Sequence, residues 1–110
     1  MNPKDDQLIP MRPYFIRAIR EWAMDNGLTP QLLVDTSIDG VVIPKGYAQD
    51  GKIVLNVHMQ AVKALELGNE FITFSARFGG ISHAINLPIQ SVLAVFAREN
   101  SQGIFFQEED

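Results

Sequence analysis

Hydrophobic and polar residues alternate most regularly along residues 71–78, Phe-Ile-Thr-Phe-Ser-Ala-Arg-Phe. Because successive side chains of a strand point to opposite faces, Ile72, Phe74, Ala76 and Phe78 share one apolar face. The small Ala76 interrupts this row, and Gly79-Gly80 follows it. The pattern allows either a groove beside the end of the strand or a tightly packed core position followed by an ordinary turn. Composition alone favours the core position.

A helix is predicted between Pro13 and Gly27, after a polar arm of residues 1–11. Proline suits the first position of a helix, and glycine suits the residue just past its end, where left-handed backbone is needed. Thr29-Pro30 then prevents the helix from continuing.

The predicted helix is apolar on more than one side. Phe15, Ile19 and Trp22 fall on one stripe, whereas Ile16 and Met24 lie partly off it. A helix with two apolar sides must bury both of them. Two interpretations stay open: the same helix of a second copy packs against it around a two-fold axis, or the helix is deeply buried in its own domain.

From Leu32 onward, short apolar runs alternate with turn residues. Asp50-Gly51 is a strong hairpin signal before the run from Ile53 to Val57, and Gly68-Asn69 turns the chain back into the strand at Phe71. Other runs cover residues 32–34, 41–43, 84–87, 93–98 and 104–106, with one helical turn expected from Pro88 to Ser91. About six short strands after one helix predict an α+β fold, mainly β. We expect a single domain over residues 1–110, with the helix followed by a small, strongly curved antiparallel sheet or partial barrel.

Composition narrows the possible chemistry. The chain has no cysteine, so it forms no disulfide, thiolate nucleophile or zinc–cysteine site. Asp35 to Gly40 matches the first half of a calcium loop, but the twelfth position is Gly46 rather than Glu. Because no catalytic, cofactor or complete metal motif is present, we expect no enzyme activity, no cofactor and no metal.

Charge and hydropathy indicate a cytoplasmic protein that binds neither membranes nor nucleic acid. The net charge is −4, and the nine Lys and Arg residues are scattered, whereas phosphate binding needs them clustered. The longest apolar run, Val92 to Ala97, is too short to span a bilayer, and the acidic start is unlike a secretory signal.

Two polar residues are candidates for contacts with a bound peptide. Arg77 can donate to a carboxylate or to backbone carbonyls, or it can stay solvated on the outer face of its strand. Asn56 follows Ile53-Val54-Leu55 and can either cap a turn or reach a peptide backbone.

Several short motifs, in this order and spacing, resemble the stringent starvation protein B (SspB) family. The resemblance runs from about Arg12 to Phe106 and is carried by Arg12-Pro13-Tyr14, Arg17-Ala18, Glu21-Trp22, Asp25-Asn26, Leu28-Thr29-Pro30, Val34-Asp35, Asp50-Gly51, Ile53 to Asn56, Ala76 to Ile81 and Ala97 to Asn100. Family members often carry Asn where this chain has Ser75, a difference that bears on the contacts with the peptide tag that the family binds.

The resemblance implies a homodimeric, non-enzymatic adaptor with an Sm-like sheet behind an N-terminal dimerising helix. Such adaptors bind the ssrA degradation tag of stalled translation products and deliver tagged proteins to the ClpX unfoldase of the ClpXP protease. The family's groove corresponds to Ser75 through Gly80, and Ala76 is the position that is most characteristic of it. The peptide-binding residues expected here are Tyr47, Ser75, Ala76, Arg77, Phe78, Gly79 and Phe105, and the dimer surface is expected to include Phe15, Ile16, Ile19 and Trp22.

Two further expectations belong to this interpretation. Family members continue into an acidic tail that docks on ClpX, whereas these 110 residues end at Glu108-Glu109-Asp110 without it. The alternative function is an Sm-like module for single-stranded RNA, in which exposed aromatic residues would stack on bases. The acidic balance of the chain opposes that alternative.

Overall fold

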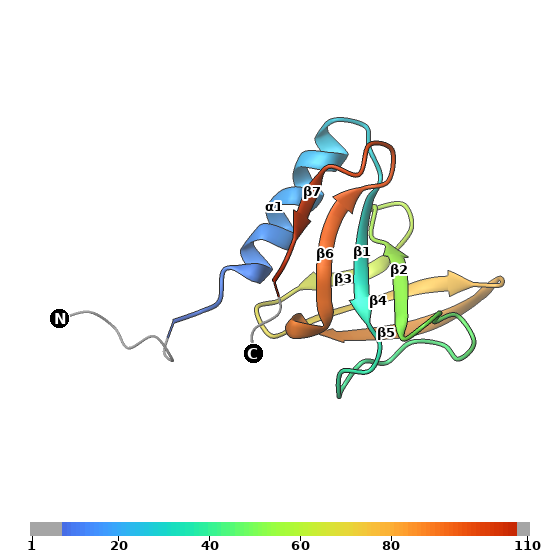
Figure 1. Ribbon diagram of the computed structural model, residues 1–110. Helices are drawn as coiled ribbons and strands as arrows, with labels where there is room; N and C mark the ends of the chain where they lie inside the picture. Colours follow the sequence, from blue (N-terminus) through green and yellow to red (C-terminus); the bar gives the residue numbers. More distant parts are fainter. Residues whose placement is uncertain (1–7, 108–110) are drawn as a thin grey trace.

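The computed structural model describes residues 8–107 and contains one helix followed by two small antiparallel sheets (Figure 1). The prediction of an α+β fold, mainly β, with an N-terminal helix is confirmed. Residues 1–7 of the predicted polar arm and the end at residues 108–110 lie outside the described part of the chain.

The helix α1 spans Arg12–Asp25, close to the predicted limits. Pro13 lies in its first turn, where a missing N–H costs no hydrogen bond. At the other end the Asn26 side chain donates to the Trp22 carbonyl, and Gly27 adopts the left-handed φ of 69°. The Leu28 N–H then donates to the Ala23 carbonyl, which closes the helix and turns the chain toward the first strand.

The strands form two sheets rather than one continuous curved sheet. The four-stranded sheet has the order β2-β1-β6-β7, and the three-stranded sheet has the order β3-β4-β5. The strands are β1 (Pro30–Asp35), β2 (Lys52–Asn56), β3 (Lys63–Leu67), β4 (Phe71–Phe78), β5 (Ile81–Pro88), β6 (Val92–Ala97) and β7 (Gly103–Phe105). The predicted helical turn after Pro88 is the 3₁₀ segment η2 (Ile89–Ser91) between β5 and β6. Of the predicted strand at residues 41–43, only a bridge between Val42 and Asn86 forms, because Pro44 follows at once.

The core lies between the inner faces of the two sheets and one side of α1. Its largest fully buried side chains include Ile16 of the helix, Leu32 and Val34 of β1, and Ile72 of β4. β1 alternates buried and half-buried residues along its length, so Leu33 faces outward between two core positions. The alternation along β4 likewise buries Ile72 and Phe74, as the sequence predicted.

The hairpin of β4 and β5 projects beyond this core (Figure 1). Its strands pair continuously as far as Phe78 and Ile81, and the turn between them is Gly79-Gly80. Both glycines have positive φ, 59° and 82°, as the tightest two-residue hairpin turns require. Glycine adopts this backbone without a steric cost, so the pair lets the chain reverse within two residues.

Candidate functional site

A cavity of about 360 Å³ opens beside the end of β4, along the outer edge of β2. Its lining is mostly apolar and comes from β1, β2, β4 and the loop before β2: Leu33, Tyr47, Gln49, Lys52, Ile53, Val54 and Phe78. Such a volume, with apolar walls and a few polar groups, is typical of a ligand site.

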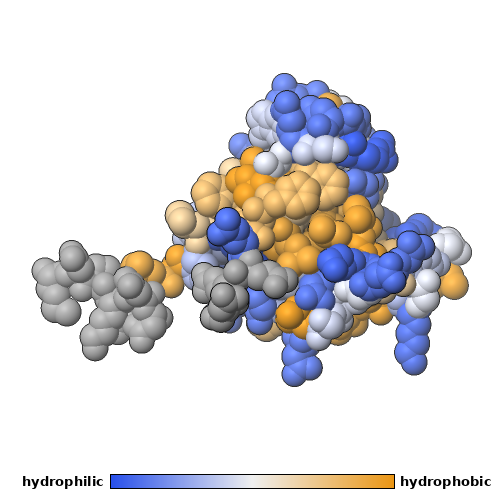
Figure 2. Space-filling model, viewed as in Figure 1, coloured by the Kyte–Doolittle hydropathy of each residue, from blue (hydrophilic) through white to orange (hydrophobic). Residues whose placement is uncertain are grey.

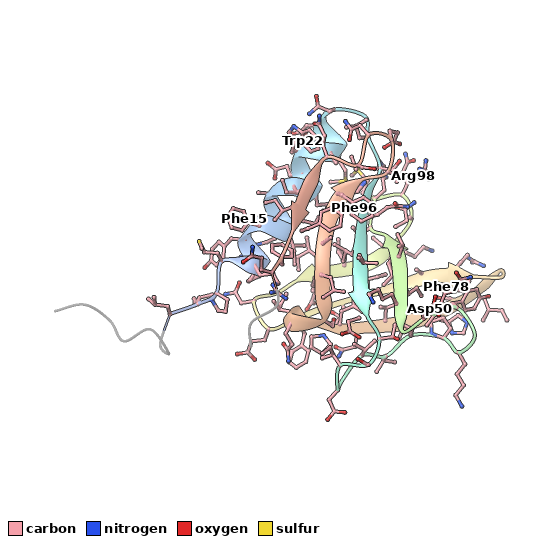
Figure 3. The ribbon with its side chains drawn as sticks, in the orientation of Figure 1. Phe15, Trp22, Asp50, Phe78, Phe96 and Arg98 are labelled. Carbon is pink, nitrogen blue, oxygen red and sulfur yellow. The ribbon has the colours of Figure 1, made fainter. Side chains whose placement is uncertain are left out.

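Two aromatic rings form one wall of the cavity. Tyr47 meets the edge of Phe78 with ring centroids 4.9 Å apart, and Phe78 in turn meets His83 at 5.8 Å. Edge-to-face pairs of this kind hold each ring in place. Figure 3 shows Phe78 at the end of the projecting hairpin, on the same side of the molecule as Asp50.

Gly79 shapes the position of Tyr47. A Cβ at residue 79 would lie 3.1 Å from the Tyr47 hydroxyl oxygen, and the φ of 59° disfavours any larger residue. The structure therefore brings together three of the predicted peptide-binding residues, Tyr47, Phe78 and Gly79, although they come from separate segments.

Ala76 lies on the same face of β4 as Phe78, is half-buried, and packs against the edge of the core. It is next to the cavity along the strand but does not line it. Ser75 and Arg77 lie on the opposite face of β4 by strand alternation. The Arg77 guanidinium is exposed and donates to the Gly80 carbonyl at 3.1 Å, so it stabilises the turn of its own hairpin.

Phe105 is placed away from these residues. It lies on β7, which β1 and β6 separate from β2, and its ring stacks on Phe96 at 5.9 Å. It is 64% exposed and lines a second hollow next to the helix. The structure thus groups Phe105 with the helix surface rather than with Tyr47 and Phe78.

Sequence reasoning missed five of the residues that line the cavity: Leu33, Gln49, Lys52, Ile53 and Val54. The Asp50-Gly51 signal did predict a hairpin turn here, and Gln49 and Lys52 form a bridge across that turn. Nothing in the local pattern indicated that the end of β4 would come to the edge of β2. That meeting depends on how the two sheets pack.

The side of α1 that faces away from the core forms a second surface. A hollow of about 460 Å³ is lined by Ile19, Trp22, residues 101–103 and Phe105. Phe15 is 39% exposed on the same helix, and Met11 and Tyr14 near its start are also exposed. Figure 2 shows apolar side chains gathered over the middle of this view, and Figure 3 shows Phe15 and Trp22 along the outer side of the helix. Ile16, predicted for the same surface, is instead completely buried in the core of its own chain and contributes nothing to it.

Asn56 and the acidic residues have structural roles in this fold. The Asn56 side-chain oxygen accepts the His58 N–H at 2.9 Å, which caps the turn after β2. Hydrogen bonds from Ser37 lower the pKa of Asp35, and hydrogen bonds from Thr29 lower the pKa of Glu99.

Among residues 8–107 no group of three or more potential metal ligands comes together, and no helix there is long and apolar enough to cross a membrane.

Comparison with known proteins identifies the family of this chain. The family model of stringent starvation protein B matches residues 10–110. The chain is also 46% identical over 101 residues to the stringent starvation protein B homolog of Haemophilus influenzae, covering 92% of this chain and 67% of that protein. The chain therefore belongs to the stringent starvation protein B family.

Proposed function

We propose that this protein is a cytoplasmic, non-enzymatic adaptor that binds ssrA degradation tags and delivers tagged proteins to the ClpXP protease. Family membership supports an adaptor role. The observation that carries the finer proposal is the apolar cavity between Tyr47, Phe78 and the edge of β2. It offers an open-ended site of the kind that an extended peptide can enter.

The polar groups at the cavity suit a peptide better than a nucleic acid. Among residues 8–107, Lys52 is the one cation that lines it, and Gln49 supplies an amide. Phosphate backbones are bound by several clustered cations. Apolar contacts shared with a few hydrogen bonds are instead typical of peptide grooves, which gain affinity from being formed before the peptide arrives.

We further propose that the protein acts as a homodimer through α1. Phe15 is exposed on the side of the helix away from its own core, and the partly buried Ile19 and Trp22 line the hollow at Phe105 beside it, although Ile19 also packs against that core. A second copy of the same surface would cover these side chains around a two-fold axis. Each dimer would then hold two tags.

Delivery follows from effective concentration. An adaptor that holds the tag while a flexible tail holds ClpX makes capture of the substrate nearly intramolecular. We assign that link to a tail beyond Asp110, outside these 110 residues. No chemical step by the adaptor is needed.

Isothermal titration calorimetry with a synthetic ssrA peptide tests the proposal. We expect binding with one peptide per chain, and binding weakened at least tenfold by Ala76→Gln, whose longer side chain would extend along the face that leads to Phe78. Ala84→Gln is the matched control, because Ala84 is exposed on the outer face of the neighbouring strand β5. No peptide binding by the unmodified protein would refute the function, and equal affinities of the two variants would refute the placement of the site.

A further inference from the structure

The four residues that precede α1, residues 8–11, are apolar and lie in water. Leu8, Ile9 and Met11 are 55%, 54% and 71% exposed. Figure 1 shows this N-terminal segment, in dark blue, running away from both sheets. The Phe15 N–H donates to the Met11 carbonyl at 3.1 Å, so the segment is fixed to the helix at its base. Its side chains therefore project beyond the start of α1, where the core of their own chain does not cover them.

The outer side of α1 continues this apolar surface along the helix. A stripe with the spacing four, three, four consists of Met11, Phe15, Ala18 and Trp22. That spacing is typical of the seam between two packed helices. Ala18 is exposed at the middle of the stripe, and its small side chain lets a second helix approach closely.

The far end of the stripe has a hollow instead of a projection. The hollow of about 460 Å³ lies beside Trp22 and is also lined by residues 101–103 and Phe105. Phe105 is largely exposed there. Each chain therefore has a projecting apolar segment at the start of α1 and an open, partly apolar hollow near its end.

Only one of the two symmetric ways to pair α1 joins these features. Parallel helices would place the two N-terminal segments side by side and leave both hollows open. Antiparallel helices, paired about a point between Phe15 and Trp22, would bring Phe15 of the second copy level with Trp22 of the first. Met11 of the second copy would then lie about one turn farther along, roughly 6 Å. From there three extended residues reach about 10 Å, enough to approach residues 101–103.

The area available for contact also favours a role for the segment. A large apolar side chain in full exposure offers roughly 200 Å², so Phe15 and Phe105 together expose about 200 Å² per chain, and Leu8, Ile9 and Met11 about 350 Å². Stable interfaces bury at least roughly 1,200 Å² in total, more than half of it apolar. Two copies paired without the segments would bury about 400 Å² of this apolar surface, which is too little, whereas the segments raise it to about 1,100 Å².

We propose that two copies pair through antiparallel α1 helices and exchange their N-terminal segments, so that residues 8–11 of each copy pack into the hollow beside Phe105 of the other. The inference rests on the proposed homodimer. It adds the orientation of the two helices and a contact that each copy supplies to its partner.

Removing the apolar side chains of the segment tests its contribution. The double variant Leu8→Ser, Ile9→Ser should raise the dissociation constant of the dimer at least tenfold in sedimentation equilibrium, because two large side chains no longer leave water on pairing. The matched control is Val42→Ser, Ile81→Ser, which changes two similarly exposed apolar residues at β5 and should leave the constant unchanged. None of the four side chains belongs to the core, so both variants should fold.

Cross-linking tests the orientation. The chain has no cysteine, so Ile9→Cys and Gln102→Cys each introduce a single thiol. With a short bis-maleimide, a mixture of the two single variants should give linked dimers, whereas neither variant alone should. Linked dimers from Ile9→Cys alone would show parallel helices and overturn the proposal.

The two measurements separate this inference from the homodimer on which it rests. If the unmodified protein dimerises but the Leu8→Ser, Ile9→Ser variant dimerises equally well, segment exchange is refuted and the homodimer stands. If the unmodified protein sediments as a monomer at every concentration, the homodimer fails and the exchange fails with it.

Discussion

Neighbouring helix residues Phe15 and Ile16 should respond in opposite ways to truncation, because they lie on different sides of α1. Ile16 is fully buried against the sheets, whereas Phe15 is 39% exposed. We expect Ile16→Ala to destabilise the fold of each chain. We expect Phe15→Ala to leave that fold almost unchanged and to weaken self-association.

The magnitude for Ile16 follows from its burial. Truncation to alanine removes roughly three carbon atoms, each worth about 0.8 kcal/mol of transfer free energy. Because the surrounding sheets relax only partly, the remaining cavity adds to this, and the total loss should be about 3–4 kcal/mol. For a domain of this size, the midpoint of thermal unfolding should fall by roughly 13–17 °C.

Thermal unfolding followed by circular dichroism at several protein concentrations separates the two effects. Association stabilises the folded state by mass action, so a variant that weakens it has a midpoint whose difference from the parent grows with concentration. Phe15→Ala should behave in this way, with a lower mass in analytical ultracentrifugation. The difference for Ile16→Ala should remain large at every concentration. A loss below about 1 kcal/mol for Ile16→Ala, or an equal and concentration-independent loss for Phe15→Ala, would contradict the assignment of the two helix sides.

Two further predictions concern the strand that carries Phe105 and the loop before it. Gly103→Ala should destabilise the protein by about 1–3 kcal/mol in urea unfolding, because a Cβ there would overlap the Val95 carbonyl oxygen of β6; Gln102→Ala, at an exposed neighbour, should cost little. Hydrogen bonds from Thr29 lower the pKa of Glu99 below its ordinary 4.5, so they stabilise the fold above that pH and are lost as the pH falls through the lowered pKa. The urea midpoint of Glu99→Gln should therefore depend less on pH, between roughly 5 and 3, than the midpoint of the unmodified protein does. If the midpoints of the two proteins fall in parallel over this range, the Glu99 carboxylate does not contribute to the pH dependence of stability.

The sequence was most informative where local chemistry determines the structure. Pro13 and Gly27 set the ends of α1, and Asp50-Gly51 and Gly79-Gly80 both turn hairpins with positive φ. The alternation along β4 gave its buried face correctly. These features depend on steric limits within a few residues, so they can be predicted without knowledge of the rest of the fold.

The two-sided helix shows where local reasoning stops. Periodicity placed Phe15, Ile19 and Trp22 on one stripe and Ile16 partly off it, and the family resemblance then assigned Ile16 to the dimer surface. Neither of them shows which stripe meets the sheets. In the structure Pro13, Ile16 and Ala23 are buried, and the Arg20 side chain reaches across to donate to the Val57 carbonyl at 2.8 Å. Long-range contacts of this kind hold the helix in its rotation, and no local pattern encodes them. The same limit separated Phe105 from Tyr47, since strand order and not sequence spacing decides which edge each residue occupies.

Strand order would also allow the proposed peptide binding and the proposed self-association to coexist. β2, which borders the cavity, is at one edge of the four-stranded sheet, and β7, which borders the helix surface, is at the other. A second copy that covers Phe15, Ile19 and Trp22 would therefore pack at the far edge from Tyr47 and Val54. Both cavities of such a dimer would stay open, so occupancy of one by a tag should leave the affinity of the other unchanged. Calorimetric titration of the dimer should then fit a single class of two independent sites. Two distinct binding steps would show that a tag in one cavity changes the affinity of the other, which would contradict the separation implied by the sheet order.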